Sequence, residues 1–266
     1  MKSGNASNNP APAFSFASRP QGLRHAGACL LALVMAMHGS AKDIVVEKGE
    51  APSLKAAADA KVTAGGATIV VPSPAKDMAE VTEDLDREAV KVFVPSSNRL
   101  LTSFVLSSEL PISKMRGKVL SRYALVEIPL KAESMDCKPD DFKLVTDELK
   151  KGFGDTIAAT TKEVQEEFDH RLKQLHVDNL KMSFEKPVEI GVLFSKEDAY
   201  GFGLMSLTSV SGTSVKIAVA CTFVRAKERL IFCYLYAKYK DDDTIKALRK
   251  TSEQWADAIL LANKER

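Results

Sequence analysis

The feature that most constrains the fold is a change of hydrophobic pattern after Asn179, where apolar residues begin to alternate with polar ones. Alternation with a period of two predicts β-strands. The strand-like runs are Met182–Phe184, Val188–Phe194, Tyr200–Val210, Ser214–Val224 and Leu230–Tyr239. The links between them are as short as Ala226-Lys-Glu228, and such links join only antiparallel neighbours. This half of the chain is therefore predicted to form an antiparallel meander.

The last strands of this meander carry apolar groups on both faces. One face holds Ile217, Val219, Cys221 and Phe223, and the other holds Ala218, Ala220 and Val224. A strand with two apolar faces must be covered on both sides, or by a helix on at least one side. The sequence supplies two candidate helices for this purpose.

The first candidate helix covers residues 140–176. Its apolar residues recur at helical spacing, at Phe142, Val145, Leu149, Ile157, Val164, Phe168, Leu172 and Leu175. Pro139 suits a first helical position, and the acids Asp140 and Asp141 suit the positive end of the helix dipole. Because Gly152 and Gly154 interrupt the pattern, we expect one long helix or two helices with a bend there.

The second candidate helix ends the chain. The run Asp241-Asp-Asp243 offers an N-cap and acids for the first turn. An amphipathic stripe follows at Ile245, Leu248, Ser252, Trp255, Ile259 and Ala262. The single tryptophan lies in the middle of this stripe, so we expect it to be a core residue rather than a platform for a ligand.

These patterns predict an α+β domain in which an antiparallel sheet packs against a long central helix and a C-terminal amphipathic helix, in an α/β/α sandwich-like arrangement. We place this domain at 89–266, with further strands at Val90–Val94, Leu100–Leu110 and Val119–Leu130. Residues 42–88 are rich in Ala with scattered Gly and Pro, and they contain one acidic cluster at 80–88. This segment is predicted to be a mostly irregular extension of low complexity, with short apolar runs such as Ala67–Val71 as possible edge strands.

Residues 1–41 have the organisation of a secretory signal peptide. The basic residues Arg19 and Arg24 precede the apolar run Ala26–Met37, and small residues lead to Ala41. The apolar run is shorter than the roughly 18 to 20 residues that span a bilayer as a helix. We therefore predict cleavage after Ala41, a periplasmic or secreted protein, and contact with the membrane only through the signal; an uncleaved signal anchor is the alternative.

The charge balance argues against a nucleic-acid partner. The whole chain carries a net charge of +2, and Lys2, Arg19 and Arg24, the only charged residues of the signal, contribute +3, so removal of the signal leaves −1. Binding to nucleic acid usually needs a surplus of Lys and Arg matched to phosphates. We therefore expect no nucleic-acid partner.

Three cysteines follow the signal, at Cys137, Cys221 and Cys233. An exported protein meets an oxidising compartment, so one intramolecular disulfide is possible. If Ala226-Lys-Glu228 is a three-residue loop, Cys221 lies opposite Cys233 and the two can form a cross-strand bridge. The alternative is two small apolar core residues, because a two-residue loop would shift the register and separate the sulfurs.

No recognised catalytic motif is present. The sequence contains no Gly-x-Ser-x-Gly elbow, no phosphate-binding loop and no His-Glu-x-x-His zinc motif. Glu166 and His170 are one helical turn apart and could offer a carboxylate and an imidazole to a metal, but no third ligand can be nominated. We expect no metal and no cofactor. Nearby carboxylates are expected to raise the pKa of Cys137 and make it a poor nucleophile.

Two further patterns have both a structural and a functional interpretation. Gly201-Phe-Gly203 begins like a dinucleotide fingerprint but lies in strand-like sequence, so close backbone packing explains it better. Tyr234 and Tyr236 lie on one strand face. These tyrosines either fill the space between sheet and helix or form a binding surface. The charged pair Glu166 and His170 is a second candidate for a binding surface.

The element order over residues 89–263 resembles the PsbP-like α/β/α sandwich. The segment Val215–Asn263 carries the resemblance, because a hairpin is followed there by an Asp-capped helix at Thr244–Asn263. Members of that group are mostly accessory or binding proteins without enzymatic activity, which the resemblance implies here. The chain also resembles exported bacterial proteins of unassigned function.

Two hypotheses of function follow. The first is an exported, non-enzymatic binding or accessory module whose ligand is a protein or another envelope component. The alternative is a hydrolase-type enzyme that uses acid and base residues of the 140–176 helix, namely Glu166, Glu167, Asp169 and His170, without a recognisable motif. The sequence leaves the oligomeric state open.

Overall fold

The computed structural model describes residues 59–91, 93–112, 119–151, 165–166, 169–170, 182–210 and 213–264. Eight strands of this part form one antiparallel sheet in the order β3-β4-β5-β10-β9-β8-β6, with β7 pairing β8 beside β6. Their bounds are β3 Met78–Glu80, β4 Asn98–Leu106, β5 Arg122–Pro129, β6 Met182–Phe184, β7 Val188–Ser195, β8 Ala199–Val210, β9 Thr213–Ala226 and β10 Arg229–Lys238. A separate hairpin consists of β1 (Ala60–Ala64) and β2 (Ala67–Val71).

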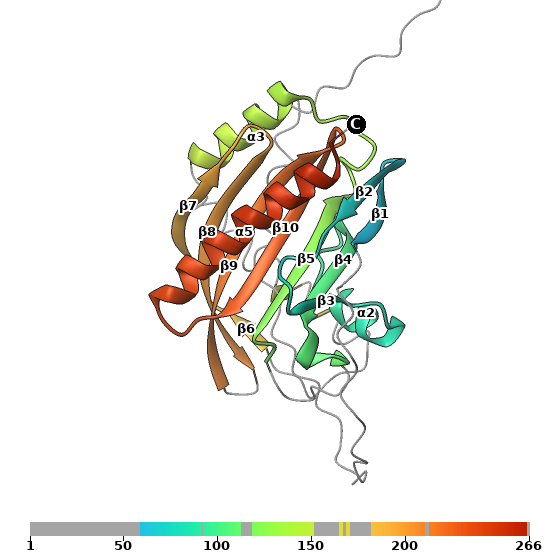
Figure 1. Ribbon diagram of the computed structural model, residues 1–266. Coiled ribbons are helices and arrows are strands. Elements are labelled where there is room, and N and C mark those ends of the chain that lie inside the picture. The colour runs from blue at the N-terminus through green and yellow to red at the C-terminus, as the bar shows by residue number, and fades with distance from the viewer. Residues whose placement is uncertain are drawn as a thin grey trace, which may run out of the picture.

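The helices are α2 (Asp84–Lys91), α3 (Pro139–Lys151) and α5 (Asp242–Ala262), with a short 3₁₀ turn at Ser107–Glu109. Figure 1 shows α5 lying across the sheet with the β1–β2 hairpin beside its C-terminal end. The predicted α+β class with an antiparallel sheet is confirmed. No helix in the described part of the chain is long and apolar enough to cross a bilayer.

The predicted meander is confirmed for β7, β8, β9 and β10, which pair in sequence order and antiparallel. It is wrong for the first predicted strand, since β6 pairs with β8 and not with β7. The loop between β9 and β10 differs from the three-residue loop that we considered. Ala226 pairs directly with Arg229, and Lys227 and Glu228 form a two-residue turn with φ angles of 49° and 58°. Positive φ at both central residues is the geometry of a type I′ turn, whose twist suits a hairpin.

This turn overturns the predicted pairing of Cys221 with Cys233. In the observed register Cys221 lies opposite Tyr234, and Cys233 lies opposite Thr222. A slip of one residue moves a side chain to the other face of a sheet. The two thiols therefore belong to different core clusters, one on each face, and Cys137, Cys221 and Cys233 are all free and buried.

Helix α3 begins where the sequence predicted, with Pro139 first and Asp140 and Asp141 in the first turn. Its buried residues Phe142, Val145 and Leu149 belong to the core cluster of one sheet face. Most of the predicted helix beyond Lys151 lies outside the described residues. The exceptions are 165–166 and 169–170, which are helical.

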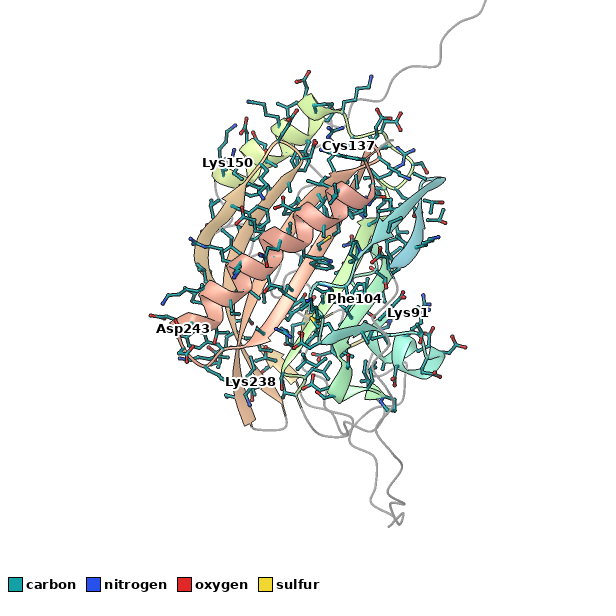
Figure 2. All side chains as sticks on the ribbon, viewed as in Figure 1. Lys91, Phe104, Cys137, Lys150, Lys238 and Asp243 are labelled. Carbon is teal, nitrogen blue, oxygen red and sulfur yellow. The ribbon has the colours of Figure 1, made fainter. Side chains whose placement is uncertain are left out.

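Helix α5 covers the other face, and its predicted cap is confirmed. The predicted stripe is buried at Leu248, Ser252, Trp255 and Ile259, whereas Ile245 is only partly buried and Ala262 is exposed. The Asp241 carboxylate accepts a hydrogen bond from the Thr244 backbone N–H at 3.1 Å, and the Asp241 N–H donates to Thr244 Oγ1 at 3.4 Å. Trp255 is buried, packs edge-on against Phe104 of β4 and donates from Nε1 to the Pro72 carbonyl at 2.7 Å. Figure 2 places Phe104 beside α5.

The predicted irregular extension is wrong for residues 60–88, although the possible edge strand at Ala67–Val71 is confirmed as β2. The hairpin side chains Val62, Ile69 and Val71 are buried in the same cluster as Trp255, so the core starts at Ala60 and not at Ala89. The predicted strand at Val90–Val94 is also wrong, because Val90 ends a helix. Asp84 and Asp86 lie in the first turn of α2, where carboxylates favour helix formation. The predicted signal lies outside the described residues.

Candidate functional site

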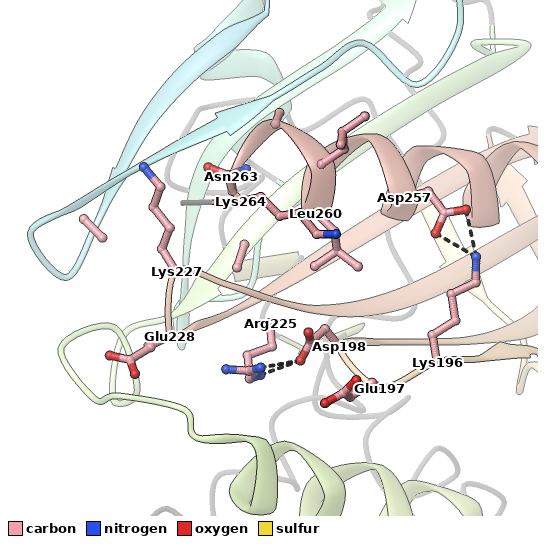
Figure 3. A pocket seen from close by; sticks show the side chains of 14 residues that line it. Lys196, Glu197, Asp198, Arg225, Lys227, Glu228, Asp257, Leu260, Asn263 and Lys264 are labelled. Atoms are coloured by element: carbon pink, nitrogen blue, oxygen red, sulfur yellow. Dashed lines mark hydrogen bonds and ion pairs between the residues drawn. The ribbon is translucent and has the colours of Figure 1, made fainter. Parts of the chain in front are cut away.

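An open groove lies at one end of the sheet, where four segments meet (Figure 3). These are the β7–β8 turn, the β9–β10 turn, the last turns of α5 and the start of β2. The groove has a volume of about 1140 Å³. Tight turns bring charged residues from distant parts of the sequence together here.

Lys196, in the β7–β8 turn, ties this turn to α5. Its Nζ lies 2.7 Å from Asp257 Oδ1 and 3.1 Å from Glu253 Oε1, two carboxylates one helical turn apart. Partial burial of the amine acts to lower the pKa of Lys196, but the hydrogen bonds to Asp257 and Glu253 outweigh it, and the pKa is raised. Lys196 is therefore a charged support of the groove wall.

Asp198 and Arg225 form a second pair, which joins the β7–β8 turn to the end of β9. Arg225 Nε donates to Asp198 Oδ1 at 2.7 Å, and the Arg225 backbone N–H donates to the Asp198 carbonyl at 2.9 Å. Both side chains are largely buried. Because backbone and side chain act together, this wall has little conformational freedom.

Asn263 joins the end of α5 to β2. Its Oδ1 accepts from the Val70 N–H at 2.9 Å, and its Nδ2 donates to the Val70 carbonyl at 2.7 Å. Nδ2 also donates to the Ile259 carbonyl at 2.8 Å. The amide thus satisfies the outer edge of β2 at Val70 in the way a neighbouring strand would.

The β1–β2 turn beside the groove is held by charged side chains. The Gly65 N–H donates to Glu133, which pairs with Arg99, and Arg229 Nη2 donates to the Gly65 carbonyl at 3.1 Å. The hydrogen bond from Arg99 lowers the pKa of Glu133. A Cβ at Gly65, where φ is +52°, would lie 2.0 Å from the Glu133 carbonyl oxygen, so only glycine fits this turn.

An apolar residue is exposed within this polar rim. The Leu261 side chain is 72% exposed, which is the largest value among the large hydrophobic residues in the described ranges. Leu260, Ala226 and Ala262 line the groove next to it. Leu261 therefore adds exposed apolar surface to a groove whose walls are charged.

The structure excludes the predicted tyrosine surface. Tyr234 and Tyr236 are 1% and 2% exposed. They belong to a buried ladder of rings with centroid separations between 4.4 and 6.4 Å, formed by Tyr123, Tyr236, Tyr234, Phe232, Phe223, Phe202 and Tyr200. The alternative interpretation, packing between sheet and helix, is the correct one.

Glu166 and His170 are both exposed and both helical. The structure does not bring them to the groove, whose lining comes from other segments. Within the described ranges, no three His, Cys, Asp or Glu side chains converge as a metal site would require.

Cys137 is buried, with its backbone N–H donating to the Glu228 carbonyl at 2.7 Å. Burial, followed by the charge of Asp141, raises the pKa of its thiol to about 12. Figure 2 shows Cys137 at the same end of the molecule as the C-terminal end of α5. A thiol with such a pKa is protonated at neutral pH and is a poor nucleophile. The sequence predicted this direction from the nearby carboxylates, whereas burial is the larger cause.

The interpretation of Gly201 and Gly203 as sites of close packing is confirmed. A Cβ at Gly201 would lie 2.4 Å from Cε1 of Phe194, and one at Gly203 would lie 3.1 Å from the Ile190 Cβ. Both glycines allow β7 side chains to cross over β8. A dinucleotide fingerprint is not needed to explain them.

Sequence reasoning missed the groove, although it identified two of its turns. In the sequence, Ser195–Asp198 and Ala226–Glu228 indicate only short links between strands. The available signal was their charge, since Lys196, Asp198 and Lys227 all lie in turns that antiparallel pairing brings to one end of a sheet.

No protein-family model matches the chain, and no curated protein sequence matches it. Among solved structures, the chain is similar to the Ran-binding protein Mog1p of Saccharomyces cerevisiae at 11% identity, covering 78% of this chain and 93% of that one, with a TM-score of 0.29. A mutant of Mog1 gives the same identity and TM-score and covers 77% of this chain and 93% of that one.

Cyanobacterial PsbP from Synechocystis is similar at 12% identity and a TM-score of 0.32, covering 77% of this chain and 95% of that one. PsbP belongs to the group that the element order of residues 89–263 resembles, and at this TM-score the similarity is weak.

Proposed function

We propose that this protein is an accessory module that binds another protein through the groove at the end of the sheet. The observation that carries the proposal is the exposed Leu261 between ordered charged walls. Protein interfaces commonly combine an apolar centre with a polar rim of this kind. The groove walls are held by contacts within the protein, so little ordering is needed when a partner binds.

We further propose that the module works outside the cytoplasm, in the periplasm or after secretion, with an envelope protein as its partner. The support is the signal-like organisation of residues 1–41, with cleavage after Ala41. Intact-mass measurement of the protein purified from cells tests this directly. A mass that starts at Lys42 supports export, whereas a mass that includes Met1 argues against it.

We also infer that the layers form an α/β/α sandwich-like arrangement. The inference is supported by α3 and α5, whose buried side chains belong to core clusters on opposite faces of the main sheet.

Capture of a partner tests the binding function. Tagged wild-type protein and the Leu261→Asp variant are cross-linked in cell envelopes, purified and compared by quantitative mass spectrometry. Leu144→Asp, on α3, is the matched control because Leu144 is also exposed, at 50%. One protein recovered near stoichiometry with the wild type and the control, and lost with Leu261→Asp, supports the proposal. Recovery that the Leu261 variant does not change would overturn it.

A further inference from the structure

Strand β2 has an outer edge that faces the groove and is only partly satisfied. In an antiparallel hairpin, alternate residues direct their backbone N–H and C=O groups away from the partner strand. Val70 is one such residue, since both of its groups bond to Asn263. Thr68, two residues earlier and opposite Thr63, is therefore the next.

Thr68 is exposed, and its outward N–H and C=O have no hydrogen-bond partner in the part of the chain that the structure describes. Its neighbour Ala67 lines the groove. An unfilled donor and acceptor on a strand edge are the groups that an added strand engages. Because the Asn263 amide already bonds to the backbone N–H and C=O of Val70, the open edge is short and runs only from Thr68 toward the β1–β2 turn.

The side of the groove next to this edge carries positive charge. Lys227 extends toward the β1–β2 hairpin (Figure 3), and Lys264 also lines the groove. None of the ion pairs between described residues at this end of the sheet involves either lysine. Glu228, next to Lys227, points away from the hairpin, and Glu197 and Asp198 lie on the opposite side. Asp198 and Asp257 are already neutralised by Arg225 and Lys196.

We propose that the groove binds an extended, acidic segment of the partner protein, which pairs with Thr68 as an added strand. This proposal rests on the protein-binding function proposed above and specifies its mode. Side chains alternate along a strand, so one face of the segment places an apolar residue on Leu261 while acidic neighbours reach Lys227 and Lys264. The backbone contact supplies affinity for extended chains, and the lysines select for acidic ones.

The test uses the mature chain and labelled synthetic peptides, with binding followed by fluorescence anisotropy. One eight-residue peptide alternates Leu with Glu, and a second has Lys in place of Glu. We expect the acidic peptide to bind at least about tenfold more tightly than the basic one, and this preference to vanish in the double variant Lys227→Glu, Lys264→Glu. Lys250→Glu, an exposed change elsewhere on α5, is the matched control and should leave the preference intact.

The backbone contact is tested by Thr68→Pro, which removes the outward N–H, and by an acidic peptide with N-methylated amides. Each should weaken binding about tenfold, and the peptide form does so without any change to the protein. Equal binding of acidic and basic peptides, or equal binding of methylated and unmethylated ones, would overturn the proposal. Capture of a partner in a Leu261-dependent manner, without preferential binding of the acidic peptide, would support the protein-binding function and overturn the proposed strand-addition mode.

Discussion

The two faces of the main sheet are filled in opposite ways. On the α3 face the strands themselves supply the bulk, through the ladder of seven rings from Tyr123 to Tyr200. On the α5 face β8 and β9 carry the small residues Gly201, Gly203, Ala218 and Ala220, while β4 contributes Phe104 and the helix supplies Trp255. A core needs a certain volume of side chains, and either the sheet or the helix can provide it.

This difference determines where the groove lies. Small residues on β8 and β9 allow α5 to lie close to the sheet, and side chains of α5 then reach past the sheet to the β1–β2 hairpin. Trp255 bonds to the Pro72 carbonyl, and Asn263 bonds to Val70. The end of α5, the hairpin and two turns therefore converge on the groove.

Replacing Trp255, the large side chain of α5, should cause the largest loss of stability. We expect Trp255→Ala to lower the free energy of unfolding by about 3–5 kcal/mol, because it leaves a cavity beside Phe104 and removes the hydrogen bond to the Pro72 carbonyl. Urea denaturation measures this change.

Trp255→Phe is the control for the tryptophan. It keeps an aromatic ring near Phe104 and loses the bond to Pro72, so it should cost about 1–2 kcal/mol. On the other face, Phe223→Leu should cost less than Trp255→Ala, because neighbouring rings share the volume. Equal losses on the two faces would contradict the contrast.

Enlarging the small residues should be the next most damaging change. Gly201→Ala places a Cβ where the Phe194 ring lies, and we expect a loss of about 1–2 kcal/mol in the free energy of unfolding. Gly203→Ala should cost less, because the nearest atoms are 3.1 Å away. Adding Phe194→Leu to the Gly201 variant should recover part of the loss. No recovery would show that strain at the backbone, and not the ring contact, is responsible.

The ion pair of Glu133 with Arg99, which holds the β1–β2 turn, should make a small, pH-dependent contribution to stability. The lowered pKa of Glu133 means that its ionised form stabilises the fold at pH values above the ordinary 4.5, and that this stabilisation is lost as the pH falls through the lowered pKa. We expect Glu133→Gln to cost up to about 1 kcal/mol at pH 6, and this cost to shrink as the pH falls through the lowered pKa. Thermal unfolding across this range measures it, and a constant difference would contradict the assignment.

The redox state of the solution should have no effect on stability through the cysteines. Burial raises the pKa of Cys221 and Cys233, which lie on opposite faces. With the raised pKa of Cys137, this predicts that the three thiols react with a thiol reagent only after unfolding. A reducing agent should leave the melting temperature of the mature protein unchanged. A shift, or an intact mass lower by two hydrogens, would indicate a disulfide that this fold does not accommodate.

Local patterns predicted much of this fold because their causes are local. Alternation of apolar residues predicted the strands from β7 to β10, and Asp241 predicted the start of α5, since both depend on nearby residues. The same reasoning failed at Val90–Val94, where Val90 lies in the last turn of a helix, and at Ala60–Ala64, which becomes a strand by pairing with β2. It succeeded at Ala67–Val71, the possible edge strand that is β2.

The sequence by itself determined the antiparallel meander, the two helices that were identified and the burial of Trp255, because period, caps and apolar stripes lie within a few turns of chain. Only the tertiary structure decided the register that separates Cys221 from Cys233. The Lys227–Glu228 turn has two residues, and a turn one residue longer would move every side chain of one strand to the other face of the sheet. The tertiary structure also decided the groove, because Thr68, Lys196 and Leu261 are far apart in the chain and are brought to one end of the sheet by long-range pairing and helix packing.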